Sequence, residues 1–159
     1  MLRQTDKNRL GGAYFERVFA HRARMAGCMA IKNPLAYKRI GQGKSIAVFA
    51  ELDFTLVCYD GRIAFVDAKQ FQKLKVTHSQ FTAHQIDKAV RYNHYRVAAG
   101  FAVHFVAIDA VYYFSGLQIC AIKGGRSLPF DAGVCLGPTG TFDVMPIFET
   151  CLNGVCRGA

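Results

Sequence analysis

The 159-residue sequence lacks the features of a membrane or exported protein. Its longest apolar stretch, residues 97–108, is interrupted by Gly100 and His104 and is shorter than the ~18 residues that a membrane span needs. The first nine residues contain no apolar segment of the kind found in a secretory signal. The six cysteines form no CxxC pair and lie mostly in apolar runs, which is typical of reduced core thiols. We therefore expect a soluble cytoplasmic protein with no membrane partner.

Acidic residues are also scarce, with 11 Asp and Glu against 20 Lys and Arg, which gives a formal net charge of +9. The excess lies in residues 1–44, where ten basic side chains stand against only Asp6 and Glu16. The remaining residues are close to neutral. A basic face of this kind attracts polyanions, chiefly nucleic acid or anionic lipid. The alternative is a basic protein that its charge merely keeps soluble.

Apolar residues, in contrast, make up 52% of the chain and include 13 Phe and 7 Tyr, which excludes a disordered basic tail. The length favours one domain over residues 1–159. Hydrophobic periodicity and turn residues predict an α/β fold, a mixed sheet with helices packed on it. The expected elements are a helix over 13–26, a strand over 29–31, a basic loop over 33–44, strands over 45–58 and 63–69 joined at Asp60-Gly61, a helix over 82–99, strands over 101–108 and 111–114, and a peripheral, Gly-rich β tail over 116–159.

Charged residues interrupt the two apolar strands of the predicted hairpin. Period-two alternation places Glu51 and Asp53 on one face of the first strand, and Asp67 and Lys69 on one face of the second. A two-residue turn would set Asp53 opposite Ala68 and separate the acids. A three-residue turn, with Gly61 in the left-handed conformation, sets Asp53 opposite Asp67 and Glu51 opposite Lys69.

In the second register the two carboxylates repel each other unless a cation or a proton lies between them. A hard, oxygen-liganded ion such as Mg²⁺ suits that position, and Lys69 could hold an attacking water or stabilise charge on a phosphate. This arrangement suits hydrolysis of phosphodiesters. The alternative is a pair of exposed acids in which Lys69 makes an ordinary cross-strand salt bridge.

Asp53 followed by Asp67-Ala68-Lys69 resembles the core motif of the PD-(D/E)XK nuclease superfamily. More narrowly, the chain resembles the RecU-type Holliday junction resolvases of bacteria and their phages over about residues 8–115. The segment Phe81-Thr82-Ala83-His84-Gln85-Ile86 resembles the family's helix with a metal-site Gln, and Asn8-Arg9 with Glu16 resembles its N-terminal helix.

The resemblance implies a restriction-endonuclease-like core that binds Mg²⁺, with Mn²⁺ able to substitute. It assigns the metal to Asp53, Asp67 and Gln85, with Glu51 where the family commonly has Thr, and it assigns transition-state stabilisation to Lys69. Glu16 is expected to be catalytic. We expect DNA contacts from basic residues of the N-terminal third and from two residues near the site: Arg9, Arg17, Arg22, Lys32, Lys38, Arg39, Lys44, Lys73 and His84.

Several features depart from the family or have a plainer explanation. Leu52 stands in place of the Pro of the superfamily name, and the second acid is Asp67 rather than the commoner Glu. The segment from Pro34 to Asp53 is shorter than the typical stalk that enters the junction centre. Thr82-x-x-Gln85 is also a helix capping box, and Glu16 could be a solvated helix residue.

The sequence therefore predicts a Mg²⁺-dependent endonuclease that resolves Holliday junctions in DNA recombination and repair, in a bacterial cell or encoded by a phage. A homodimer is expected, because two symmetric nicks require two related sites. The alternatives are a nuclease of the same superfamily that acts on flaps, ends or duplex DNA, and a DNA-binding protein without activity.

Overall fold

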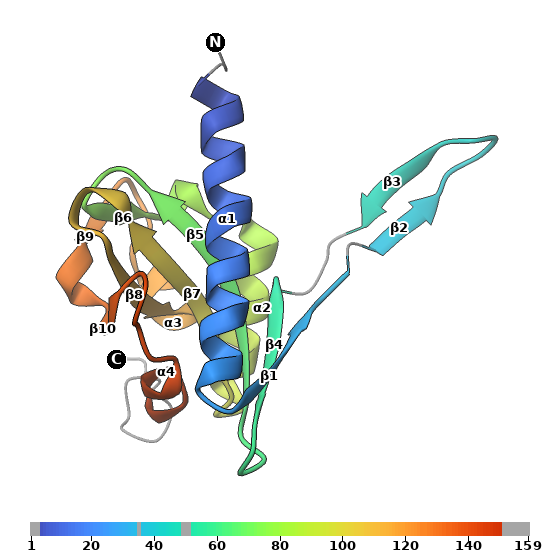
Figure 1. The fold of residues 1–159 in the computed structure, drawn as a ribbon. Coiled ribbons are helices and arrows are strands. Elements are labelled where there is room, and N and C mark those ends of the chain that lie inside the picture. Colours follow the sequence, from blue (N-terminus) through green and yellow to red (C-terminus); the bar gives the residue numbers. More distant parts are fainter. Residues whose placement is uncertain (1–3, 35, 49–51, 151–159) are drawn as a thin grey trace.

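The computed structural model describes residues 4–34, 36–48 and 52–150. A six-stranded mixed sheet lies at its centre (Figure 1). The strands follow the order β1 (Cys28–Lys32), β4 (Phe54–Cys58), β5 (Ile63–Phe71), β7 (Ala98–Phe105), β8 (Ala110–Ser115) and β10 (Val134–Pro138). β5 and β7 are parallel, and the other neighbours are antiparallel.

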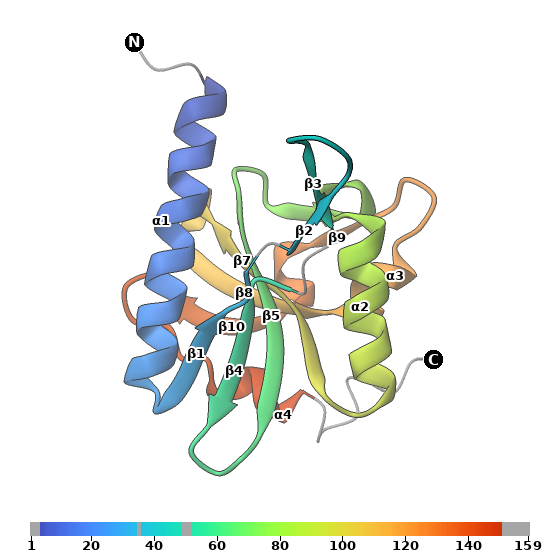
Figure 2. The same ribbon diagram turned by 90° about the vertical axis from the view of Figure 1, so that its right-hand side faces the viewer.

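Helices cover both faces of this sheet (Figure 2). α1 (Gln4–Met25) and α4 (Met145–Glu149) pack on one face, and α2 (Ala83–His94) and α3 (Gly116–Ala121) pack on the other. α1 presents Phe15, Phe19 and Ala23 at helical spacing, and all three are fully buried. The short elements are β6 (Lys75–Thr77), which pairs with β9 (Ser127–Pro129), and three 3-10 turns: η1 (His78–Gln80), η2 (Val106–Ile108) and η3 (Phe130–Ala132).

The register of the β4–β5 hairpin is the one that a three-residue turn requires. Phe54 pairs with Val66, and Val57 pairs with Ile63. Gly61 has φ 86°, a left-handed conformation that glycine adopts without steric cost. The same register, extended by one residue, sets Asp53 opposite Asp67. Of the two registers that the sequence allowed, the structure therefore has the one that brings the acids together.

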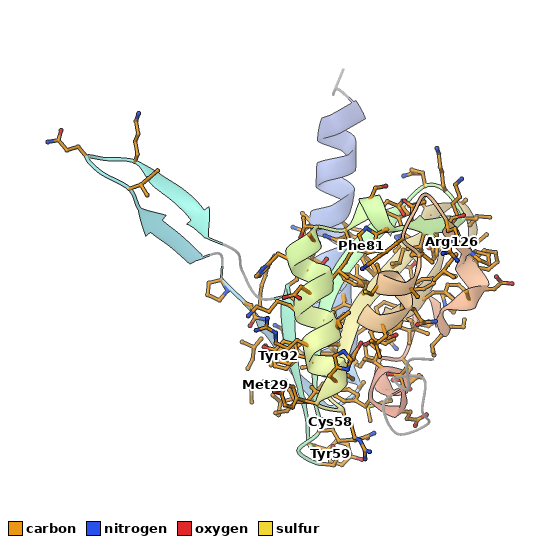
Figure 3. The ribbon with its side chains drawn as sticks, turned by 180° about the vertical axis from the view of Figure 1, so that it is seen from behind. Met29, Cys58, Tyr59, Phe81, Tyr92 and Arg126 are labelled. Carbon is orange, nitrogen blue, oxygen red and sulfur yellow. The ribbon has the colours of Figure 1, made fainter. Side chains whose placement is uncertain are left out.

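The segment predicted as a basic loop over 33–44 forms part of a second hairpin. β2 (Ala36–Arg39) pairs with β3 (Ser45–Val48), and Gly41 and Gly43 supply left-handed conformations in the turn. We call residues 36–48 the arm, because they project away from the body (Figures 1 and 3). The prediction of one continuous strand over 45–58 was wrong, since β3 and β4 belong to different sheets.

Other predicted boundaries also need correction. α1 begins at Gln4 rather than residue 13, and α2 ends at His94 rather than Ala99. Arg96 has φ 60°, which interrupts the helix, and Ala98 and Ala99 then enter β7 beside β5. The strands predicted near residues 29–31 and 111–114 are confirmed.

The C-terminal segment is neither purely β nor peripheral, contrary to the prediction. β10 is a strand of the main sheet, and residues 116–121 and 145–149 are helical. Phe142, Val144 and Ile147 are buried in the core under α1. Their burial explains why a Gly-rich segment is ordered, since each apolar side chain removed from water offsets part of the chain's ordering entropy.

None of the helices within residues 4–150 that the structure describes combines the length and the apolar character of a transmembrane segment.

Candidate active site

The candidate site lies on the α2 face of the sheet, where β5 carries Asp67 and Lys69 and the segment before β4 carries Asp53. Asn33 holds this segment in place. Its backbone N–H donates to the Asp53 carbonyl oxygen at 2.8 Å, and its side-chain Nδ2 donates to the Leu52 carbonyl oxygen at 2.6 Å. Thr55 Oγ1 donates to Asn33 Oδ1 at 3.0 Å. Sequence analysis missed this positioning residue, because the Asn33-Pro34 pair indicated only a loop.

Asp67 is the most buried acid of the site, with a side chain that is 1% exposed. Gln85 Nε2 donates to its Oδ1 at 3.0 Å. Lys69 Nζ lies 2.7 Å from its Oδ2 as an ion pair. This pairing compensates the charge of a carboxylate that is almost completely buried, and removing either partner would leave an uncompensated charge.

Asp53 is half-buried beside Asp67, and its pKa is raised to about 6. Burial is the largest cause, and the charge and carboxyl group of Asp67 are the next. The Ala68 backbone N–H, which donates to Asp53 Oδ2 at 3.1 Å, and the Lys69 ammonium lower the pKa by less. The Asp67 carboxyl group therefore disfavours the charged form of Asp53, which is the condition that a bound cation relieves.

Gln85 forms the capping box that the sequence allowed, and its side chain also contacts Asp67. Its Oε1 accepts a hydrogen bond from the Thr82 backbone N–H at 3.1 Å, while the Gln85 backbone N–H donates to Thr82 Oγ1 at 3.2 Å. This is a complete capping box at the start of α2. Because the same side chain also reaches Asp67, the cap fixes an amide at the site. The amide oxygen that a metal would require is the atom that accepts from Thr82.

The donor set fits a hard divalent cation. Among the described residues, no three His, Cys, Asp or Glu side chains converge on one point. The site offers the carboxylates of Asp53 and Asp67, and Mg²⁺ in proteins commonly uses one or two carboxylates and keeps several waters. The raised pKa of Asp53, caused in part by the neighbouring Asp67 carboxylate, favours an added positive charge between the two acids. Glu51, also predicted as a ligand, lies outside the described residues.

The structure does not bring Glu16 to these acids. α1 packs Phe15 and Phe19 onto the opposite face of the sheet, and the Glu16 carboxylate forms an ion pair there with Lys32. Lys32 in turn lies over the Phe54 ring, 5.9 Å from its centroid. Both residues line an open groove of about 520 Å³ together with Arg17 and Arg24. Two predicted site residues, Glu16 and Lys32, therefore meet each other rather than Asp67.

The predicted DNA contacts are dispersed over the molecule. Arg17 and Lys44 are exposed, on α1 and in the turn of the arm respectively, and Lys73 is exposed beyond the end of β5. His84 is half-buried in the first turn of α2. Arg9 lies in α1, and Lys38 and Arg39 lie in β2, but their side chains are outside the described part of the structure.

Arg22 differs from these residues, because its guanidinium is engaged within the fold. Nε donates to the Phe142 carbonyl oxygen at 2.8 Å, and Nη2 donates to the Thr141 carbonyl oxygen at 2.9 Å. The residue thus joins α1 to the C-terminal segment, across about 120 positions of sequence. A predicted contact of the Arg22 guanidinium with DNA would compete with these two hydrogen bonds to carbonyl oxygens.

Comparison with known proteins gives no match to a family model and none to a curated protein sequence. Among solved structures, the chain is similar to Hjc from Archaeoglobus fulgidus, a Holliday junction resolvase from an archaeal hyperthermophile. The TM-score is 0.53 and the sequence identity 16%, over 78% of this chain and 95% of Hjc. The fold is restriction-endonuclease-like. This confirms the predicted α/β class, whereas the closer likeness to bacterial RecU-type proteins rests on the sequence motifs alone.

Proposed function

We propose that this protein is a Mg²⁺-dependent endonuclease that resolves Holliday junctions. The observation that carries the proposal is the buried Asp67, which lies between Lys69 and Gln85 with Asp53 opposite, at the centre of a sheet folded like that of a resolvase. A solvated salt bridge would not bury a carboxylate to 1% exposure beside a second acid whose pKa it raises.

The side chains of the site have separable roles in this reaction. Gln85 and Lys69 hold Asp67 in one orientation, and Asn33 and the Ala68 N–H hold Asp53. The Lys69 side chain is 26% exposed, so its ammonium can donate to a phosphate oxygen as negative charge develops there. Mg²⁺ held by Asp53 and Asp67 would supply Lewis-acid stabilisation of the same charge.

Branched DNA is the proposed substrate, and the arm and the basic residues of α1 are the proposed contacts with its phosphates. A homodimer would supply the two nicks that a four-way junction requires. The exposed edge strand β1 supports self-association, because Met29 and Ile31 on it are 62% and 44% exposed.

The experiment that tests this function compares substrates. Purified protein is incubated with labelled four-way junction, flap and linear duplex of matched sequence, with Mg²⁺, Mn²⁺ or EDTA. We expect paired nicks in the junction that require the metal, and sedimentation as a dimer. Equal cutting of all three substrates would favour a general nuclease of this fold. Binding of DNA without any cutting would overturn the proposed activity.

A further inference from the structure

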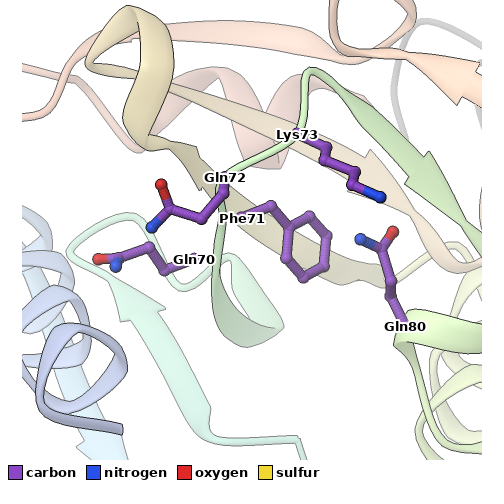
Figure 4. Close-up of a pocket in the computed structure, with 5 residues that line it drawn as sticks. All are labelled: Gln70, Phe71, Gln72, Lys73 and Gln80. Atoms are coloured by element: carbon purple, nitrogen blue, oxygen red, sulfur yellow. The ribbon is translucent and has the colours of Figure 1, made fainter. Parts of the chain in front are cut away.

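A small cavity of about 210 Å³ opens where β5 ends, and the function proposed above does not use it. Figure 4 shows the side chains that line it, which are Gln70, Phe71, Gln72, Lys73 and Gln80. The Phe71 ring, the Lys73 ammonium and the Gln80 amide lie on one side of this chain segment, whereas Gln70 and Gln72 extend to the other side, and no acid is among the lining residues.

The cavity lies close to the candidate active site along the same strand. Asp67, Lys69 and Phe71 share one face of β5, because alternate residues of a strand point the same way. At about 3.3 Å per residue, Phe71 lies roughly 7 Å beyond Lys69 and roughly 13 Å beyond Asp67. With about 3.4 Å between successive nucleotides along the helix axis, this distance corresponds to about two to four nucleotides. A strand cut at Asp67 could thus place a nearby base at the cavity.

The polar groups of the cavity that have a defined orientation are donors. Gln80 Oε1 accepts a hydrogen bond from the Thr77 backbone N–H at 2.7 Å, which leaves the Nε2 hydrogens of Gln80 for a ligand. Figure 4 shows this amide and the Lys73 ammonium near each other, beside the Phe71 ring. Gln70 lies on the opposite face of β5, where its Oε1 is 3.4 Å from Nδ1 of His104, a residue that packs on Phe15 of α1. Gln72 is exposed at the rim.

We propose that this cavity binds a guanine of the DNA strand that the protein cuts, an inference that rests on the proposed nuclease function. The edge of guanine presents two acceptors, O6 and N7, to the donors Lys73 and Gln80, and Lys is a common partner of these atoms. Adenine and cytosine would each place an amino donor against these donors. The ring of Phe71 offers an apolar surface for the base, which a phosphate would not need.

The test maps cut positions on junctions of permuted sequence, with wild-type protein and two cavity variants. Gln80→Glu keeps an oxygen that can accept from the Thr77 N–H but replaces the Nε2 donor by a carboxylate oxygen. Lys73→Ala removes the ammonium. Lys75→Ala is the matched control, since Lys75 is exposed on β6 outside the cavity. We expect wild-type and Lys75→Ala proteins to prefer guanine at one fixed position within about four nucleotides of the cut. Both cavity variants should lose at least about fivefold of this preference.

Substituting that guanine with 7-deazaguanine, which lacks N7, should reduce wild-type cutting there by at least about fivefold. An unchanged rate with the analogue, or an unchanged preference in both variants, would overturn the guanine site and leave the nuclease function standing. If wild-type protein cuts no DNA, the nuclease function fails. The site is then tested by the affinity for oligonucleotides that carry guanine or 7-deazaguanine, and equal affinities overturn it.

Discussion

Gln85 Nε2 donates to Asp67 Oδ1 across 3.0 Å, and this contact ties the start of α2 to the central strand of the sheet. The capping box and the acid therefore depend on each other. The cap orients the Gln85 amide, and the amide orients the buried Asp67 carboxylate. Lys69, which lies on the same strand as Asp67, forms an ion pair with its Oδ2.

Replacing Asp67 by Asn should reduce DNA cleavage by at least about 100-fold, because it removes one of the two carboxylates proposed to hold the Mg²⁺ that would stabilise charge on the reacting phosphate. DNA affinity, measured in EDTA by fluorescence anisotropy, should stay within about twofold of wild type, since Asp67 is too buried to make the main phosphate contacts. Asp87→Asn is the control, an exposed acid paired with Arg91 on α2. Cleavage by Asp67→Asn at the wild-type rate would remove Asp67 from the site.

The raised pKa of Asp53 predicts a pH-dependent stability. Between about pH 4 and pH 6 the folded chain holds a proton on Asp53 that the unfolded chain has released, so the free energy of unfolding falls as pH rises through this window. The Asp53→Asn side chain does not ionise, so this variant avoids the fall in the free energy of unfolding, and its amide oxygen can still accept from the Ala68 N–H. In metal-free buffer at about pH 7.5 it should be more stable than wild type by about 1–2 kcal/mol.

Urea unfolding at about pH 4 and about pH 7.5 measures this difference, which should nearly vanish at the lower pH. Asp131→Asn, at an exposed acid, is the control and should show no such change with pH. A stability difference between Asp53→Asn and wild type that is the same at both pH values would contradict the repulsion between Asp53 and Asp67.

In the described part of the chain, α2 and α3 begin with similar capping boxes, which allow the two roles of Gln85 to be separated. Gln118 caps α3 with Ser115 as Gln85 caps α2 with Thr82, but its amide donates to the Ala132 carbonyl oxygen instead of an acid. Gln85→Ala and Gln118→Ala should each cost about 0.5–2 kcal/mol of stability. Only Gln85→Ala should also reduce the rise in melting temperature that Mg²⁺ produces. An equal response to Mg²⁺ in both variants would assign Gln85 to the cap alone.

Arg22 and the arm should differ in their effect on DNA binding. Arg22→Ala removes two charged hydrogen bonds within the fold and should lower stability by about 1–3 kcal/mol, with little change in the salt dependence of binding. Lys38→Ala with Arg39→Ala should reduce the slope of log affinity against log salt by up to about 2. Anisotropy titrations at several salt concentrations measure both. A flatter slope in Arg22→Ala would show that its guanidinium reaches DNA in spite of its carbonyl partners.

The local features of the site were predictable, because they depend on residues close in sequence. Alternation along β5 places Asp67 and Lys69 on one face, and the spacing of Thr82 and Gln85 forms the cap. The hairpin register was narrowed to two possibilities. The turn decided between them, since Gly61 adopts the left-handed conformation.

Other features depend on contacts between distant segments. The side of the sheet on which α1 packs determines that Glu16 meets Lys32 instead of Asp67. Asn33 reaches Leu52 across 19 positions, and β3 and β4 separate into two sheets. The local sequence pattern of these segments does not predict which segments they will contact in the folded protein.

The sequence by itself determined the α/β class, the basic character of the N-terminal third and the identity of the candidate acids, because periodicity, charge and residue type are local properties. The tertiary structure decided which charged residues act together. Burial beside Asp67 raises the pKa of Asp53, Lys69 pairs with the buried Asp67, and α1 keeps Glu16 and Arg22 for other contacts. The physical reason is that the strength of a charge depends on its desolvation and its neighbours, and both arise only when distant segments pack.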